Sequence, residues 1–155
     1  MTPKRVVPAP GQESVWDYPR PPRVEETSRQ IQVFLGGEKI ADTRRAKRVL
    51  ETSHPPAYYV PREEVRMDLL RAAVGVTWCE WKGRAVYFDV VVGAETASKA
   101  AWSYPDPSAG FEAIRDHIAF YPAKMDACLV DGEAARPQTG GFYGGWITSE
   151  IVGPF

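Results

Sequence analysis

The stretch VTWCEWKGRAVYFDVVV, residues 76–92, decides the fold class. β-Branched and aromatic side chains lie on both sides of Lys82-Gly83, so the stretch predicts a β-hairpin turned at the glycine. The same design recurs around Gly36-Gly37 in residues 31–40 and around Asp131-Gly132 in residues 127–136. Dipeptides that contain glycine at such positions supply the dihedral angles that tight hairpin turns need. The sequence therefore predicts three hairpins.

Between the hairpins lie short aromatic segments that each end at a proline. They are residues 57–60, 101–104 and 118–121, closed by Pro61, Pro105 and Pro122. Proline cannot donate to a sheet ladder, so we expect strands that end there. The helix candidates, residues 62–70 and 111–116, are too short to organise a fold. The sequence predicts an all-β, or mainly β, protein of several antiparallel sheets built from hairpins, with at most one or two short helices.

The first 26 residues form a separate region with six prolines, which favours an extended arm. Val15, Trp16 and Tyr18 are large apolar groups within it, so we expect the arm to dock on the body or on a neighbouring subunit. Residues 27–155 are expected to form a single β-rich domain, since one hydrophobic core commonly serves a chain of this length. A homo-oligomer formed through the arm stays open.

Composition and charge exclude several classes of protein. Apolar residues make up 44% and charged residues 25%, and the formal net charge is −1, which gives no overall field to hold a nucleic acid. Without an apolar run long enough for a membrane span or a signal peptide, we expect no membrane association and a cytoplasmic location. Cys79 and Cys128 stand apart, so neither zinc nor any other metal or cofactor is expected.

The loop Glu51-Thr52-Ser53-His54 is one candidate for catalytic chemistry, because a carboxylate and an imidazole are the pair that general acid–base catalysis most often uses. The alternative is a structural turn in which Thr52 or Ser53 bonds the backbone and Glu51 meets a nearby arginine. Both interpretations stay open.

Lys82 is the third catalytic candidate, after Glu51 and His54, and would contact an anion. A lysine close to Cys79 could also activate that thiol. In a strand, however, Cys79 shares a face with Trp81 and not with Lys82, so we favour a core position for Cys79.

Aromatic side chains and one arginine supply the candidates for ligand binding. Trp102 and Tyr104 share a face of their strand, and if several rings line one pocket they form a stacking platform for a planar ligand such as a nucleobase or flavin. The alternative is that these rings are core packing. The ligand-binding candidates are Tyr59, Arg62, Trp102, Tyr104 and Tyr121.

Two other motifs favour structural roles. The basic run of residues 44–48 lies close to acidic residues, so we favour a solvated strand or turn over a phosphate site. Residues 139–146 hold four glycines and three aromatics but lack the lysine and hydroxyl of a phosphate-binding loop, so backbone freedom with aromatic docking is expected.

Five segments together resemble the motifs of domain of unknown function family 427: residues 48–52, 58–65, 79–83, 101–105 and 119–121. The resemblance implies an all-β body of several strongly coiled sheets, usually in a bacterial protein, and no known activity. A nucleotidyltransferase label has been attached to the family, but this sequence lacks the glycine-serine loop and paired aspartates of such enzymes. The motif residues carried over are Glu51, Tyr59, Pro61, Cys79, Lys82, Gly83, Trp102, Tyr104, Pro105 and Tyr121.

These observations favour a small-molecule-binding domain, with a nucleotide or a cofactor among the ligands considered. Whether it is an enzyme is left open; in an enzyme the catalytic residues would be Glu51, His54 and Lys82. The alternative is a protein-interaction or structural module in which the aromatics fill the core. A concave pocket that holds two or more of the polar groups would favour the first interpretation.

Overall fold

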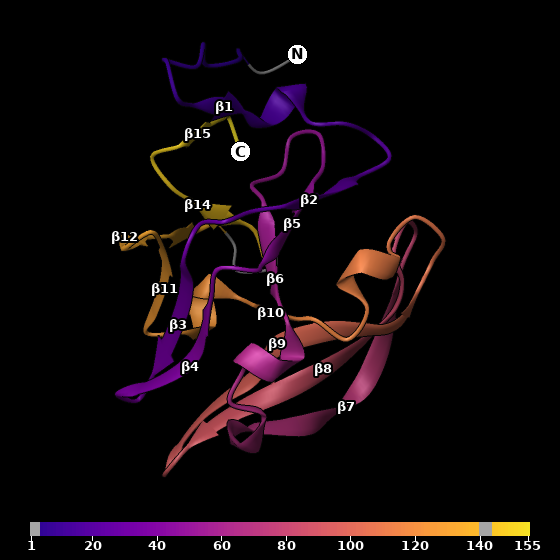
Figure 1. The fold of residues 1–155 in the computed structure, drawn as a ribbon, viewed down its shortest axis with the longest axis vertical. Helices are drawn as coiled ribbons and strands as arrows, with labels where there is room; N and C mark the ends of the chain where they lie inside the picture. Colours follow the sequence, from indigo (N-terminus) through magenta and orange to yellow (C-terminus); the bar gives the residue numbers. More distant parts are fainter. Residues whose placement is uncertain (1–3, 140–143) are drawn as a thin grey trace.

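A long, strongly coiled antiparallel sheet runs through the protein (Figure 1). The computed structural model describes residues 4–139 and 144–155. Every neighbouring pair in this sheet is antiparallel. In spatial order its strands are β2 (Arg23–Glu26), β5 (Lys47–Leu50), β6 (Ala57–Val60), β10 (Ile118–Phe120), β9 (Glu95–Pro107), β8 (Gly83–Val92) and β7 (Leu70–Cys79).

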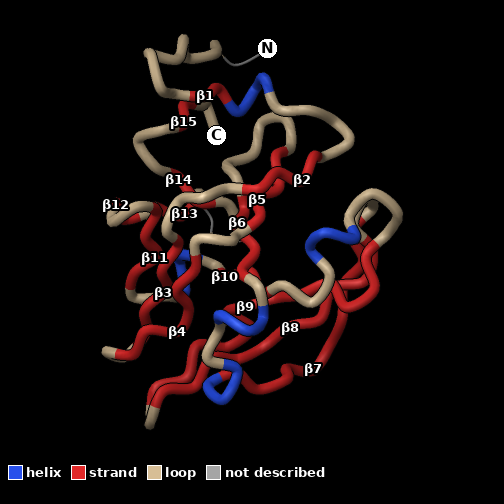
Figure 2. The backbone as a smooth tube through the Cα atoms, viewed as in Figure 1, coloured by secondary structure: helices blue, strands red, loops and turns tan. Residues whose placement is uncertain are grey.

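A smaller antiparallel sheet packs beside it (Figure 1), in the order β12 (Glu133–Ala134), β11 (Ala127–Val130), β3 (Ile31–Leu35) and β4 (Glu38–Thr43). Two short pairs complete the strands: β1 (Glu13–Ser14) with β15 (Ile151–Val152), and β13 (Arg136–Pro137) with β14 (Trp146–Ile147). Figure 2 shows that the helical segments in the described residues are short: single 3-10 turns at Val15–Asp17, Arg62–Glu64, Met67–Leu69, Glu112–Ile114 and Pro122–Lys124. Within the described ranges no helix is long and apolar enough to cross a membrane.

The all-β prediction and the three hairpins are confirmed as β3–β4, β7–β8 and β11–β12. The turn residues have positive φ, 60° and 82° at Gly36 and Gly37, and 48° and 82° at Asp131 and Gly132. Positive φ at both central positions is the pattern of the type I′ turn, whose twist matches that of the flanking strands.

Two local predictions were wrong. The helix candidates form only 3-10 turns, within residues 62–69 and 112–114. The strand predicted to end at Pro105 continues to Pro107 as part of β9. The β8–β9 register shifts between Arg84 and Val86, so Pro105 sits in an irregularity where no ladder donor is required.

Period-two alternation gives the large sheet two apolar faces. Tyr58 and Val60 of β6 point into a core shared with the small sheet. Tyr59, between them, points to the opposite face, where it joins a second cluster that includes Trp102 and Tyr104 of β9. The candidate site lies on this second face.

The N-terminal arm packs on the body of the same chain. Val15 and Tyr18 are buried in a third cluster with Leu50 and Ile151, and the Trp16 indole N–H donates to the carbonyl of Pro154. Figure 1 shows β1 and β15 paired at this end of the molecule. The last residues of the predicted arm form β2, an edge strand of the large sheet.

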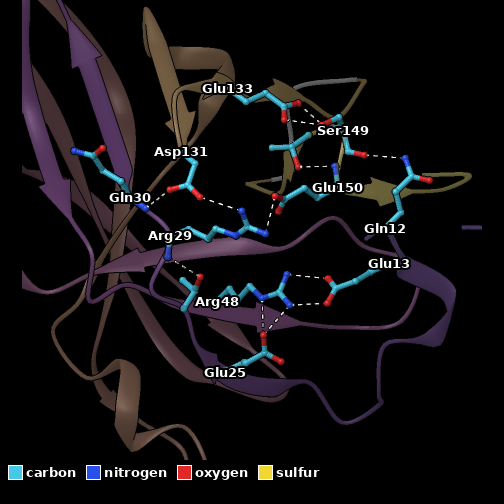
Figure 3. Close-up of polar contacts among 12 residues, drawn as sticks. Gln12, Glu13, Glu25, Arg29, Gln30, Arg48, Asp131, Glu133, Ser149 and Glu150 are labelled. Atoms are coloured by element: carbon cyan, nitrogen blue, oxygen red, sulfur yellow. Dashed lines mark hydrogen bonds and ion pairs between the residues drawn. The ribbon is translucent and has the colours of Figure 1, made fainter. Parts of the chain in front are cut away.

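A buried arginine fastens the arm to the sheet (Figure 3). Arg48 of β5 donates two hydrogen bonds to the Glu13 carboxylate, at 2.8 and 2.9 Å, and one to Glu25 of β2. The Arg48 side chain is only 13% exposed. Its hydrogen bonds lower the pKa of the Glu13 carboxyl, although partial burial opposes this shift. The basic run 44–48 is therefore neutralised here by carboxylates distant in sequence.

Candidate functional site

A cavity of about 290 Å³ opens on the second face of the large sheet. It is the place where seven of the eight candidate residues meet. The lining residues are Val49, Glu51, His54, Pro55, Ala57, Tyr59, Lys82, Tyr87, Trp102, Tyr104, Tyr121, Gln138, Gly144 and Gly145.

Adjacent strands bring together side chains that are far apart in the sequence. β10 separates β6 from β9 in the sheet and pairs with both, so Ala119 lies opposite Tyr59 on one side and Trp102 on the other. Ala119 is small, which leaves room for the two large rings to meet over it. Lys82 comes from the β7–β8 turn, and the loop after β5 supplies Glu51 and His54.

The aromatic wall is held by edge contacts and a hydrogen bond. The Trp102 indole N–H donates to the Tyr59 hydroxyl at 3.2 Å, and the two rings meet edge to face with centroids 6.0 Å apart. Tyr121 packs on Trp102 with centroids 4.5 Å apart. Only 7% of Trp102 and 1% of Tyr59 is exposed. These two rings are therefore core residues whose remaining surface lines the cavity.

The phenols of this wall stay protonated. Burial raises the pKa of Tyr59 and Tyr104 well above the ordinary tyrosine value, and raises that of Tyr121 to about 12. Losing a proton would place an anion in a poorly hydrated site. The tyrosine hydroxyls can therefore serve as hydrogen-bonding groups near neutral pH and not as bases.

The loop with Glu51 and His54 is fixed by bonds to the arm. The Thr52 hydroxyl donates to the carbonyl of Tyr18, and the Ser53 N–H donates to that of Val15. His54 Nδ1 lies 2.8 Å from the Thr52 carbonyl. A carbonyl only accepts, so this nitrogen carries a proton. The structural interpretation of this loop as a turn is met in one of its two parts. Thr52 bonds the backbone, as that interpretation requires, but no arginine meets Glu51 in the described residues.

Glu51 and Lys82 are charged groups that make no ion pair within the described residues. Throughout residues 4–139 and 144–155, neither side chain has an ion pair or a hydrogen bond to a carboxylate or cation. The Lys82 ammonium lies 5.8 Å from the centroid of the Tyr104 ring, in a cation–π contact. Two opposite charges thus line one cavity without neutralising each other.

Gln138 is a lining residue that sequence reasoning missed. Its Oε1 atom is buried and has no hydrogen-bond partner in the described part of the chain. An orphaned buried acceptor costs about 1–3 kcal/mol, so within the described part of the chain this oxygen is left for a donor such as water or a ligand. No sequence signal marks this glutamine, which follows Pro137 in a loop.

Two glycines let the C-terminal segment close against the cavity. A Cβ on Gly144 would overlap the Trp102 indole, and one on Gly145 would lie 2.6 Å from the carbonyl oxygen of Pro55. Close backbone approach is therefore the reason for glycine at these positions. Residues 140–143 of the glycine-rich motif lie outside the described residues.

Arg62 lies elsewhere, although it was a ligand-binding candidate. It follows Pro61, where β6 ends and a 3-10 turn takes the chain away from the site. Its guanidinium lies over the Phe88 ring and its Nε donates to the Asp116 carbonyl at 3.3 Å. These contacts are not part of the cavity.

A second hollow of about 520 Å³ lies beside the basic run, between Arg44, Lys47 and His117. Arg45 at its edge pairs with Glu63 and Glu64. Its charges are largely matched within the protein, which favours the solvated-strand interpretation. In the described residues, no three His, Cys, Asp or Glu side chains gather to hold a metal ion.

The comparison with family models identifies a family. No curated protein matches the chain. The family model NTP_transf_9, described as Domain of unknown function (DUF427), matches residues 23–131, which include β2 to β11 and most of the cavity wall. The chain therefore belongs to the DUF427 family.

Proposed function

We propose that this protein binds a small molecule in the 290 Å³ cavity. The observation that carries the proposal is a pair of opposite charges, Glu51 and Lys82, which line one aromatic-walled cavity and make no ion pair within the described residues. Ligand sites are mostly apolar hollows with a few convergent polar groups that fix orientation, whereas a protein core excludes unpaired charges. The orphaned Gln138 acceptor supports the same proposal.

The lining favours a planar ligand that carries both an anionic group and an N–H donor. Lys82 attracts the anion, while the carboxylate of Glu51 and the amide oxygen of Gln138 accept hydrogen bonds. The volume of about 290 Å³ lies just below the usual range of about 300–1,000 Å³, which favours one ring system with short substituents. Mononucleotides, including flavin mononucleotide, and aromatic carboxylates combine a planar ring with an anionic group.

A reaction in this cavity would use Glu51 and His54. Glu51 would take a proton from the ligand, and the imidazole, held by its Nδ1–H bond to Thr52, would be the second proton-transfer group. Lys82 would hold the anionic part of the substrate. Binding is the step the cavity supports directly, so it is tested first.

The experiment is a thermal-shift screen with mononucleotides, flavin mononucleotide and aromatic carboxylates. A ligand at about 100 times its Kd adds roughly 2.7 kcal/mol of stability. For a chain of this size each kcal/mol raises Tm by about 2–4 °C, so a true ligand shifts Tm by about 5–11 °C. Glu51→Gln and Lys82→Ala should lose most of that shift while their unliganded Tm stays unchanged.

Matched controls come from neighbouring positions. Lys124 also lies 5.8 Å from a tyrosine centroid, on Tyr121, but outside the cavity, so Lys124→Ala should keep the shift. Glu80 is exposed beside the same turn, so Glu80→Gln should also keep it. A ligand whose shift survives both cavity substitutions binds elsewhere. The alternative, a protein-interaction or structural module whose aromatics are core, is favoured if no compound in the screen gives a shift that the cavity substitutions remove.

A further inference from the structure

Strand β7 has an apolar edge that no described residue covers. Val74 is 89%, Val76 51% and Trp78 76% exposed, the largest exposed apolar side chains outside the two terminal segments. β7 is the last strand of the large sheet, so one side of its backbone has no ladder partner in the described residues. An unpaired apolar edge strand is a template for pairing with another chain.

The other sheet edges are protected, which sets β7 apart. β2, at the opposite end of the same sheet, has three charges in four residues, and β4 carries Glu38, Lys39 and Asp42. β7 is ten residues long and has a single charge, Arg71, near its start. Natural edges are usually blunted by charge, proline or short length, and the segment 76–79 carries neither a charge nor a proline.

The exposed side chains also lie on a face that is only partly covered. Val76 and Trp78 pair with Val86 and Arg84 of β8, on the face that Phe88 and Val90 present to the small sheet. The small sheet packs on the other end of this face, and the far end of the β7–β8 hairpin extends beyond it (Figure 1).

We propose that β7 pairs antiparallel with β7 of a second copy of this chain, about a two-fold axis at Thr77. In this register Val76 lies opposite Trp78 of the other copy, and Trp78 opposite its Val76. Aromatic and β-branched residues are favourable cross-strand neighbours. Arg71 lies outside the paired segment, so no like charges meet.

A second copy fits better than an unrelated strand because the edge is complementary to itself. A two-fold interface needs one patch that satisfies its own image, and the uncharged Val-Thr-Trp sequence does so in both directions. An edge built for a foreign peptide would be expected to carry charges or pockets that select it.

The same geometry limits the size of the interface. The β7–β8 register shifts between Ala72 and Val76, where Gly75 has φ of 102°, so regular pairing about Thr77 is confined to residues 76–78. Two tryptophans contribute about 300–500 Å² together, a fraction of the roughly 1,600 Å² of a standard stable interface. The dimer is therefore weak and reversible, with a Kd in the micromolar range or above.

The test measures self-association of the full chain by sedimentation velocity over a concentration series reaching about 200 µM. The wild type is expected to show a monomer–dimer equilibrium. Val76→Lys and Trp78→Glu should each weaken it at least tenfold, because each buries an unpaired charge opposite an apolar group. Val7→Lys is the control, since Val7 is an exposed valine on the arm, away from β7, and it should leave the equilibrium unchanged.

Mixing the two β7 variants tests the register itself. In a mixed dimer the lysine introduced at position 76 faces the glutamate introduced at position 78, while the Trp78–Val76 contact is kept on the other side of the axis. The mixture should associate more strongly than either variant alone, and less so at high salt. A wild type that stays monomeric overturns the proposal. A dimer that both variants retain, or a mixture no stronger than its components, overturns it as well.

Discussion

Replacing Trp102 by alanine should destabilise the protein, because this side chain belongs to the core even though it lines the cavity. It is 7% exposed, packs against Tyr121 and donates to the Tyr59 hydroxyl. Truncating a buried tryptophan costs about 3–5 kcal/mol. At about 2–4 °C for each kcal/mol, Tm should fall by about 6–20 °C.

Urea unfolding followed by circular dichroism measures this loss. Trp78→Ala is the matched variant, since that tryptophan is 76% exposed and its removal should change stability by about 0.5 kcal/mol or less. Trp102→Phe separates the hydrogen bond from the packing. It keeps a ring but leaves the buried Tyr59 hydroxyl without its donor, so an intermediate loss of about 1–3 kcal/mol is expected.

Equal stability of the two alanine variants would refute this reasoning. If Trp102→Ala unfolded at the same urea concentration as Trp78→Ala, the indole would contribute only to ligand contact, and the cavity would be larger and more adaptable than the packing indicates.

Three further predictions concern acid stability, thiol reactivity and the closure of the cavity. The hydrogen bonds from Arg48 lower the pKa of Glu13, so this pair stabilises the fold at pH values above the ordinary carboxyl pKa of 4.5. The contribution is lost as the pH falls through the lowered pKa. The Tm difference between wild type and Glu13→Gln should therefore shrink below pH 4.5. Burial raises the pKa of Cys128 to about 12, so iodoacetamide at neutral pH should label the half-buried Cys79 first. Mass spectrometry of digests measures the labelling of each cysteine, and equal labelling of the two would contradict this prediction. Gly144→Ala should lower Tm, because the new methyl group overlaps the cavity wall and overpacking costs about 1–3 kcal/mol; an unchanged Tm would mean that the segment can shift.

The hairpins and the cavity wall follow from local rules. The turns at Gly36-Gly37 and Asp131-Gly132 need positive φ, and those residues supply it. Alternation places Trp102 and Tyr104 on one face of β9 whatever the rest of the fold does. Strand order cannot be read this way, because nothing local indicates that β10 inserts between β6 and β9.

The features that sequence reasoning missed depend on contacts between residues that are far apart in the sequence. Pro105 indicates a strand end, but a shift in the β8–β9 register lets β9 continue. The counter-ions of Arg48 are Glu13 and Glu25, which lie 35 and 23 residues away. Gln138 enters the cavity because the C-terminal segment folds back over the sheet, and no neighbouring residue signals that path.

Indole N–H spectra of the protein, recorded with and without the best ligand of the thermal screen, test the central claim most directly. The chain has five tryptophans, of which Trp102 lines the cavity, whereas Trp16 and Trp146 donate to carbonyls of Pro154 and Phe120 away from it. The account predicts that the Trp102 resonance, assigned with Trp102→Phe, moves on titration while those of Trp16 and Trp146 stay in place. A ligand that leaves Trp102 unmoved and shifts Trp16 or Trp146 would contradict the assignment of this cavity as the binding site.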